Sequence, residues 1–201
     1  MNAIQIKNIT KRYKDVTALD DVSFSFEFGK IYGFLGRNGA GKTTLINIIA
    51  NRIFADQGEI LIDGIPAKEN MGVHEKIFCM SEADLYDRDL KVKDHFKWTN
   101  RFYTDFDLEK AFELSQKFNL DTNKRFKALS KGYQSIFKLI IALSLNVPYV
   151  IFDEPVLGLD ANHRELFYSL LLKEFENNER TLIIATHLIE EVSNIIEEVW
   201  C

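Results

Sequence analysis

The stretch GRNGAGKTT at residues 36–44 fits the phosphate-binding pattern G-x-x-x-x-G-K-[ST]. An apolar run at residues 31–35 precedes it and predicts a buried strand, and the apolar spacing of residues 44–50 predicts a helix after it. Strand, glycine-rich loop and helix, in this order, form the context in which the pattern binds phosphate. We therefore expect a nucleoside triphosphate to bind at this loop.

Each residue type in the loop suits a chemical task. Glycines let the backbone turn its N–H groups inward into a nest for phosphate oxygens, and the helix adds the positive end of its dipole. The Lys42 ammonium suits the β- and γ-phosphates, and the Thr43 hydroxyl is a hard oxygen ligand for Mg²⁺. The loop residues expected to bind the nucleotide are Gly36, Asn38, Gly39, Ala40, Gly41, Lys42, Thr43 and Thr44.

Composition and charge limit the class of protein. With 201 residues, of which 46% are apolar and 27% charged, the chain is long enough for one globular domain with a subdomain. A net charge of -5 provides no basic footprint, so we expect no nucleic-acid partner. Two cysteines supply neither a disulfide framework nor a metal cluster, which fits a reducing, cytosolic setting. We also expect no signal peptide and no membrane span.

Strand-like alternation flanks a polar stretch near the start of the chain. Apolar and polar residues alternate at residues 4–9 and 22–28, which predicts an antiparallel pair of half-buried strands. Tyr13 lies in the polar stretch between them. It is either a surface tyrosine, the interpretation that spacing alone favours, or a platform on which an adenine ring stacks.

Strands and helices alternate through the rest of the chain. Strands are predicted at residues 59–64, 76–80, 149–152 and 182–185, helical signals fill residues 91–145, and a further helix is predicted at residues 161–177. This order predicts a largely parallel sheet whose carboxyl ends share one edge. The expected fold is α/β: a P-loop NTPase core with a mostly parallel sheet, an N-terminal antiparallel β subdomain and an α-helical insertion.

Polar residues follow the strands at this edge: Glu82, the pair Asp153 and Glu154, and His187. Two adjacent carboxylates are costly to bury without a partner, and Mg²⁺ beside a triphosphate supplies one. We assign Asp153 to the metal shell through water and Glu154 to polarising the water that attacks the γ-phosphate. The alternative is two exposed residues that cap the next helix. His187 is either a packed histidine or a γ-phosphate contact, and Glu82 is a further metal candidate, although a carboxylate after a strand is common.

A second candidate anion site precedes the helix predicted at residues 135–145. Residues 129–134, LSKGYQ, place Ser130 and Gly132 before that helix. A serine and a glycine at a helix start are ordinary capping residues, and the exposed N–H groups there are equally an anion site. A phosphate loop and a remote tip of this kind favour a head-to-tail dimer, in which the tip of each chain closes the other's site.

The ordered motifs resemble the nucleotide-binding domains of ABC transporters over essentially the whole chain. They are the Walker A loop at residues 36–44, the signature at residues 129–133, the Walker B strand and glutamate at residues 149–154, the D-loop at residues 157–160 and a switch histidine at His187. The resemblance implies that Tyr13 is the adenine-stacking aromatic and that Asp160 contacts nucleotide. It also implies one ATPase domain over residues 1–201, with a core from residues 1–90 and 148–201 and a helical subdomain from residues 91–147.

The same resemblance implies function. ATP and Mg²⁺ are the expected cofactors, and the expected partners are a transmembrane permease and a second nucleotide-binding domain, in a homodimer or a heterodimer. We expect the ATP-hydrolysing subunit of a bacterial exporter, peripheral on the cytoplasmic face of the cell membrane. The alternative is a soluble ABC-type ATPase that is not coupled to transport. A P-loop GTPase fits less well, because the chain has no Asn-Lys-x-Asp guanine-reading motif, and a P-loop kinase fits less well, because it has no use for a signature-like helix tip.

Three features depart from the family's pattern. The signature reads LSKGY instead of LSGGQ, a form similar to the cassettes of antibiotic and peptide exporters. Glu82 stands where the family has the Q-loop glutamine. The chain ends at residues 198–201 in what resembles a late strand of the fold, where the family continues, so a shortened C-terminus is expected.

Overall fold

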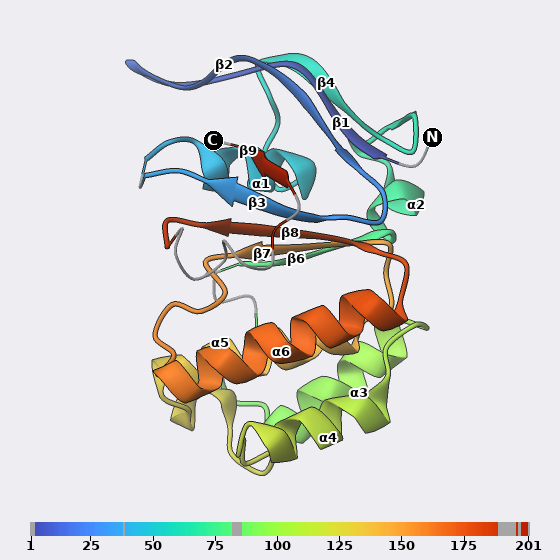
Figure 1. Ribbon diagram of the computed structural model, residues 1–201, viewed down its shortest axis with the longest axis vertical. Helices are drawn as coiled ribbons and strands as arrows, with labels where there is room; N and C mark the ends of the chain where they lie inside the picture. Colours follow the sequence, from blue (N-terminus) through green and yellow to red (C-terminus); the bar gives the residue numbers. More distant parts are fainter. Residues whose placement is uncertain (1–2, 38, 82–85, 189–195, 197, 201) are drawn as a thin grey trace. The chain divides into compact units, whose positions relative to one another are not determined.

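The fold is mixed α/β, as predicted, and it contains an antiparallel and a parallel sheet (Figure 1). The computed structural model describes residues 3–37, 39–81, 86–188, 196 and 198–200. Contacts divide the chain into two compact units. The first unit is Met1–Cys79, Val147–Asp153 and Asn178–Cys201, and the second is Met80–Asn146 and Glu154–Asn177. The predicted boundaries at residues 91 and 147 stay a prediction.

The antiparallel sheet has the strand order β2-β1-β4-β5. Its long hairpin is the predicted antiparallel pair, and Tyr13 and Val16 are the last paired residues at its turn. Register shifts interrupt the pairing of β1 with β2 at three places between Ile6 and Arg12, so the ladder of this hairpin is irregular. The strands are β1 (Ala3–Tyr13), β2 (Val16–Glu27), β4 (Gln57–Ile62) and β5 (Ile65–Pro66).

The second sheet has the order β6-β7-β8-β3-β9, and the pairs of β3 with β8, β3 with β9 and β7 with β8 are parallel. Every residue of β3, β7 and β8 is buried, which explains why these strands read as continuous apolar runs in the sequence. The strands are β3 (Ile31–Leu35), β6 (Ile77–Met80), β7 (Tyr149–Asp153), β8 (Thr181–Thr186) and β9 (Glu198–Trp200).

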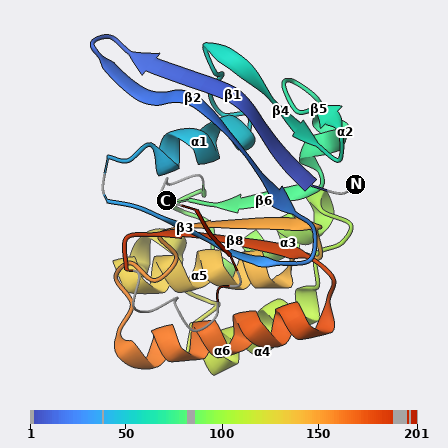
Figure 2. The same ribbon diagram turned by 45° about the horizontal axis from the view of Figure 1, so that its top comes forward.

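Helix α1 (Lys42–Ile49) lies between the two sheets in both views of the first unit (Figures 1 and 2). One buried cluster joins Ile6 of β1, Ile46 and Ile49 of α1, and Ile151 and Ile183 of the parallel sheet. This core fixes the helix that follows the phosphate loop, and with it the loop itself. The short helix α2 (Met71–His74) belongs to the same unit.

The second unit is helical, and α5 is its centre because it packs against α3, α4 and α6. Phe137 of α5 stacks on Phe96 of α3, with ring centroids 5.7 Å apart, and meets Phe126 edge-on at 5.2 Å. The elements are α3 (Val92–Phe102), α4 (Leu108–Lys117), the 3-10 turn η1 (Phe126–Ala128), α5 (Lys131–Ser144) and α6 (Ala161–Asn177). Within the described residues, none of the helices combines the length and the apolar content that a membrane span needs.

The predicted start of the helix at residue 135 is wrong. Helix α5 begins at Lys131, because Ser130 takes the extended N-cap conformation and its Oγ accepts a hydrogen bond from the Tyr133 N–H at 3.3 Å. Gly132, which lowers helix propensity, therefore lies inside the first turn rather than before it. Residues 131–134, KGYQ, therefore form the N-terminal turn of α5.

A partly buried polar contact joins the two sheets of the first unit. Asp63, which follows β4, accepts a hydrogen bond from the Tyr149 hydroxyl of β7 and one from Lys76 Nζ, each at 2.6 Å. Burial alone would raise the pKa of Asp63, but these two hydrogen bonds outweigh burial and hold the pKa below its ordinary value. The ionised carboxylate is therefore favoured by folding.

Replacing Asp63 with asparagine is expected to lower the free energy of unfolding by about 1–3 kcal/mol at neutral pH. Since the folded pKa lies below the unfolded one, the carboxylate stabilises the fold above about pH 4, and this contribution disappears as the pH falls through the folded pKa. Urea unfolding at pH 7 and at pH 3 checks this. Asp20→Asn on exposed β2 is the matched control, and an equal loss in both variants would contradict the account.

Candidate functional site

The phosphate loop is shaped by its glycines. Gly39 and Gly41 have φ values of 85° and 88°, in the left-handed region that favours glycine. The first intrahelical hydrogen bond of α1 runs from the Leu45 N–H to the Gly41 carbonyl at 2.9 Å. The N–H groups of Lys42, Thr43 and Thr44 thus precede the helical ladder and are available to an anion.

Lys42 is 7% exposed, and its Nζ donates to the carbonyls of Gly36 and Arg37, the latter at 3.2 Å. No carboxylate of the described residues lies within ion-pair distance of it. A nearly buried ammonium held by backbone carbonyls at the mouth of an N–H nest fits a phosphate group, because the anion would balance its charge. Thr43, the expected magnesium ligand, is exposed on the same turn.

The β1–β2 hairpin approaches this loop closely. A Cβ on Gly41 would lie 2.5 Å from the Ala18 carbonyl oxygen, so only glycine lets the loop pack against β2. Tyr13, at the end of the hairpin, is 46% exposed, and Val16 opposite it is 63% exposed. The Lys11 ammonium lies 5.6 Å from the centroid of the Tyr13 ring. The hairpin therefore presents a partly exposed aromatic ring and an aliphatic side chain, two surfaces on which a planar base can stack.

Strand register brings the other predicted groups of the first unit to the same sheet edge. Leu35 pairs with Thr186 and Asp153 pairs with Ala185, so β3, β7 and β8 end within one residue of each other. The end of β7 is thus two strand spacings, about 10 Å, from the start of the phosphate loop. Asp153 is 6% exposed there.

His187 directly follows β8 and is exposed at this edge. The buried Thr186 fixes the turn, because its Oγ1 accepts a hydrogen bond from the Leu188 N–H at 3.1 Å. Glu154 follows Asp153, is half-buried and has a φ of 49°, so the chain turns sharply at the strand end. Asn38 and Glu82 lie outside the described residues.

In the second unit, the tip of α5 touches the turn that precedes α6. A Cβ on Gly132 would lie 2.7 Å from the Gly158 carbonyl oxygen, and Ser135 Oγ donates to the Leu157 carbonyl at 3.2 Å. Ser130 is exposed beside this contact. The signature (residues 129–133) and the D-loop (residues 157–160) therefore lie in contact and form one continuous surface within this unit.

Asp160 caps α6 in this surface. Its carboxylate accepts the His163 N–H and faces His163 Nδ1, each at 2.9 Å, and the backbone hydrogen bond holds the pKa of Asp160 below its ordinary value. The His163 ring packs between those of Phe118 and Tyr133, at 6.0 and 5.9 Å. The Asp160 carboxylate is thus held in place by His163, in the first turn of the helix that Asp160 caps.

A model of the ABC transporter family matches residues 19–157. The chain belongs to this family. It is 30% identical over 98% of its length to the ABC transporter ATP-binding protein YtrB of Bacillus subtilis, of which it covers 67%. It is 32% identical over 98% of its length to the uncharacterized ABC transporter ATP-binding protein MJ1023 of Methanocaldococcus jannaschii, of which it covers 72%. The solved dimer of MJ0796, a bacterial ABC transporter cassette, superposes with a TM-score of 0.86 at 25% identity, covering 98% of this chain and 92% of that one.

This chain is thus the ATP-binding subunit of an ABC transporter, a family whose ATP-binding subunits form dimers and work with membrane permease components. Sequence patterns missed several of the cassette's contacts. The sequence did not point to Val16 as a site residue, because the hairpin register is what places Val16 opposite Tyr13. The packing of Gly41 on β2 and of Gly132 on the D-loop needs the tertiary structure, although a glycine among helix-forming residues is a hint of close approach.

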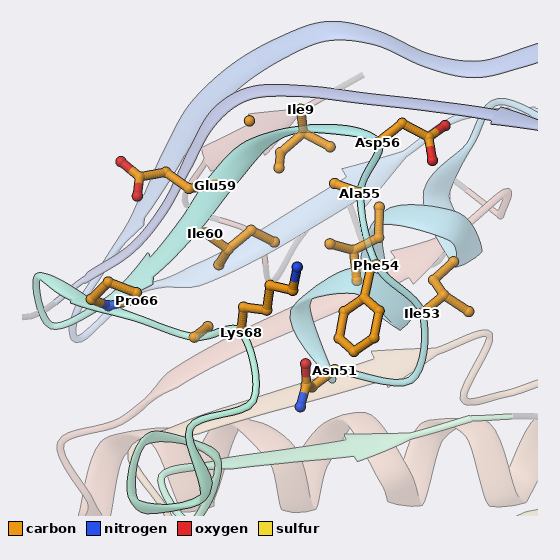
Figure 3. A pocket seen from close by; sticks show the side chains of 13 residues that line it. Ile9, Asn51, Ile53, Phe54, Ala55, Asp56, Glu59, Ile60, Pro66 and Lys68 are labelled. Carbon is orange, nitrogen blue, oxygen red and sulfur yellow. The ribbon is translucent and has the colours of Figure 1, made fainter.

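The described residues of the cassette also line a cavity of about 230 Å³ in the first unit (Figure 3). Ile48 and Asn51 place it at the C-terminal end of α1, whereas the phosphate loop lies at the N-terminal end. Lys68 Nζ stands 5.0 Å from the Phe54 ring centroid on its wall. The cavity is therefore separate from the candidate nucleotide site.

Replacing Gly132 with alanine is expected to destabilise the cassette by about 1–3 kcal/mol, because the new methyl group would press on a backbone oxygen that has no rotamer to escape. Chemical unfolding measures this. Gly72→Ala is the matched control: Gly72 is also helical, and its nearest atom to a new Cβ is 3.8 Å away. Alanine there should be neutral or stabilising. Equal effects at both positions would contradict the close approach.

Proposed function

We propose that this chain binds Mg²⁺-ATP, pairs with a second nucleotide-binding domain around ATP, hydrolyses it, and so drives a separate permease of an exporter. In this proposal Lys42 and the loop N–H groups hold the phosphates, and Thr43 and Asp153 bind Mg²⁺, with Glu82 as a further candidate. Glu154 polarises the attacking water and His187 contacts the γ-phosphate. Ser130, Gly132 and Asp160 meet the nucleotide of the partner. The subunit works at the cytoplasmic face of the membrane.

One observation supports hydrolysis most directly: β7 ends in a buried aspartate at the sheet edge where the phosphate loop begins. A buried carboxylate about 10 Å from a phosphate nest suits a cation bridged by water and phosphate oxygens. The glutamate that follows stands where a base for water is needed. Binding alone would not need this second carboxylate.

Export rather than import rests on the LSKGY signature, which is similar to those of antibiotic and peptide exporters. The family's relatives bear names of both directions. The second candidate function is a soluble ABC-type ATPase, which the compact helical insertion supports less well.

Tagging the chain in its own host, solubilising the membranes gently and identifying what co-purifies tests the transport assignment. A polytopic membrane protein in a stoichiometric amount is the expected result. Recovery from the soluble fraction alone, with ATPase activity intact, would contradict it and favour the soluble ATPase.

Replacing Tyr13 with alanine is expected to weaken ATP binding by roughly tenfold, because stacking on an exposed ring contributes about 1–3 kcal/mol per base. Tyr13→Phe keeps the ring and should bind ATP like the unchanged protein. Titration with a fluorescent ATP analogue measures both. Tyr103→Ala removes a similarly exposed tyrosine, 39% against 46%, from the other unit. Equal losses at Tyr13 and Tyr103 would remove Tyr13 from the base site.

A further inference from the structure

Helix α3 and the residue that follows it expose an aromatic ridge, defined here as Trp98 and Phe102 of the helix and Tyr103 directly after it. Their exposed fractions are 48%, 75% and 39%. The Trp98 and Phe102 rings stack on each other, with centroids 5.9 Å apart and planes 20° from parallel. Since Val92 and Phe96 fill the buried side of the helix, the ridge is not needed for the core.

The ridge is large for an unexplained surface feature. From the usual area of an aromatic side chain, its three rings expose on the order of 300 Å². This area is comparable with the largest apolar patch on a typical single protein, and such a patch is often functional. The stacking of Trp98 on Phe102 pre-organises these two rings for binding a partner.

Cations accompany the ridge. The Arg101 guanidinium lies 5.6 Å from the Trp98 ring centroid. The Lys97 side chain, one turn before Arg101, is 62% exposed and pairs with Asp94 at 3.6 Å. Residues 91–103 hold four lysines and arginines against one carboxylate, Asp94, a net charge of +3 in a chain of net charge -5. The local charge is therefore opposite to that of the whole protein.

The start of α3 extends this basic region. The Val92 N–H donates to the Lys124 carbonyl, and the Lys93 N–H donates to the Thr122 carbonyl. Residues 122–127, which these hydrogen bonds hold beside the helix, add three cations, of which Arg125 and Lys127 face Asp89. A partner with negative charge is thus favoured along the helix.

Area and composition distinguish the possible occupants. A stable contact with another protein buries about 800 Å² on each partner, more than twice what the ridge offers. Tryptophan and tyrosine rings flanked by arginine and lysine are the composition found at the headgroup level of membranes, where rings enter the acyl boundary and cations meet lipid phosphates. Each added cation strengthens attraction to an anionic leaflet.

We propose that the aromatic ridge, with Lys97 and Arg101, binds the surface of a membrane that contains anionic lipid. The contact is shallow and salt-dependent, and it needs neither nucleotide nor a second cassette. It would hold the helical unit at the bilayer in addition to any permease contact, so it stands independently of the proposed hydrolysis.

Fluorescence of Trp98 gives a direct test, because the chain has two tryptophans and the other, Trp200, stacks on Phe24 in the first unit. Trp200→Phe leaves Trp98 as the single probe. Vesicles of phosphatidylcholine with about one third phosphatidylglycerol should shift its emission to the blue and let brominated acyl chains quench it. Pure phosphatidylcholine should act weakly, and high salt should reverse the effect.

Flotation with the same vesicles compares variants. One double variant combines Trp98→Ala with Phe102→Ala, and a second combines Lys97→Gln with Arg101→Gln. Each should reduce the binding constant for the anionic vesicles by roughly tenfold or more. The matched control is Phe54→Ala, which removes a 45% exposed ring with a cation 5.0 Å above it from the other unit and should bind normally. No emission shift with anionic vesicles, or equal binding by all variants, would overturn the proposal. A cross-link from position 98 to a protein instead of lipid would overturn it as well.

Discussion

Replacing Glu154 with glutamine is expected to slow ATP hydrolysis by about 10²- to 10⁴-fold while leaving the dissociation constant for ATP unchanged. Glutamine has the same shape but cannot take a proton from water, so the change removes the base and keeps the turn at the end of β7. Steady-state phosphate release and ATP titration measure the two quantities. They separate chemistry from binding in one variant.

The strained backbone at this position makes a matched control necessary. Glu154 has a φ of 49°. Glu69, an exposed residue distant from Glu154 in the sequence, has a φ of 54°. Glu69→Gln therefore repeats the same chemical change in a similar backbone conformation and should leave hydrolysis unchanged. Undiminished hydrolysis in Glu154→Gln would remove Glu154 from the role of base.

Replacing Lys42 with methionine is expected to weaken ATP binding by roughly 10- to 100-fold, because a charge-assisted hydrogen bond contributes about 1.5–3 kcal/mol. Hydrolysis should fall further, by about 10²- to 10³-fold, since the ammonium also stabilises charge that develops on the phosphates. Methionine keeps the apolar stem, so the packing of the buried side chain is preserved.

Lys76→Met provides the comparison for this variant. Lys76 is also a hydrogen-bonded lysine of the first unit, and its partner is the Asp63 carboxylate. It lies outside the phosphate loop. Its loss should reduce stability and leave ATP affinity unchanged. If Lys42→Met bound ATP as tightly as Lys76→Met, the loop would not be the phosphate site.

The fold was largely predictable from the sequence because its central strands are covered on both faces. The runs at residues 31–35, 149–152 and 182–185 carry no alternation, and the structure buries all three in a parallel sheet. The predicted start of α5 was one turn too late, because Gly132 lowers helix propensity and made the segment directly after the Ser130 cap read as non-helical.

The site was predictable where one short segment carries it, as in residues 36–44. It was not predictable where distant segments meet. The approach of Gly41 to Ala18 depends on how the hairpin packs against the phosphate loop, and that of Gly132 to Gly158 depends on how the tip of α5 packs against the turn before α6. Burial raises the pKa of the Cys79 thiol to about 12, so the thiol stays protonated at neutral pH and is a poor nucleophile.

The most direct test of the account is sedimentation velocity of the Glu154→Gln protein with Mg²⁺-ATP and with Mg²⁺-ADP. We expect a dimer with ATP and a monomer with ADP, because only the triphosphate reaches the tip of α5 on a second cassette. A monomer in both, at ATP concentrations that saturate the loop, would contradict the proposal that two cassettes close around ATP.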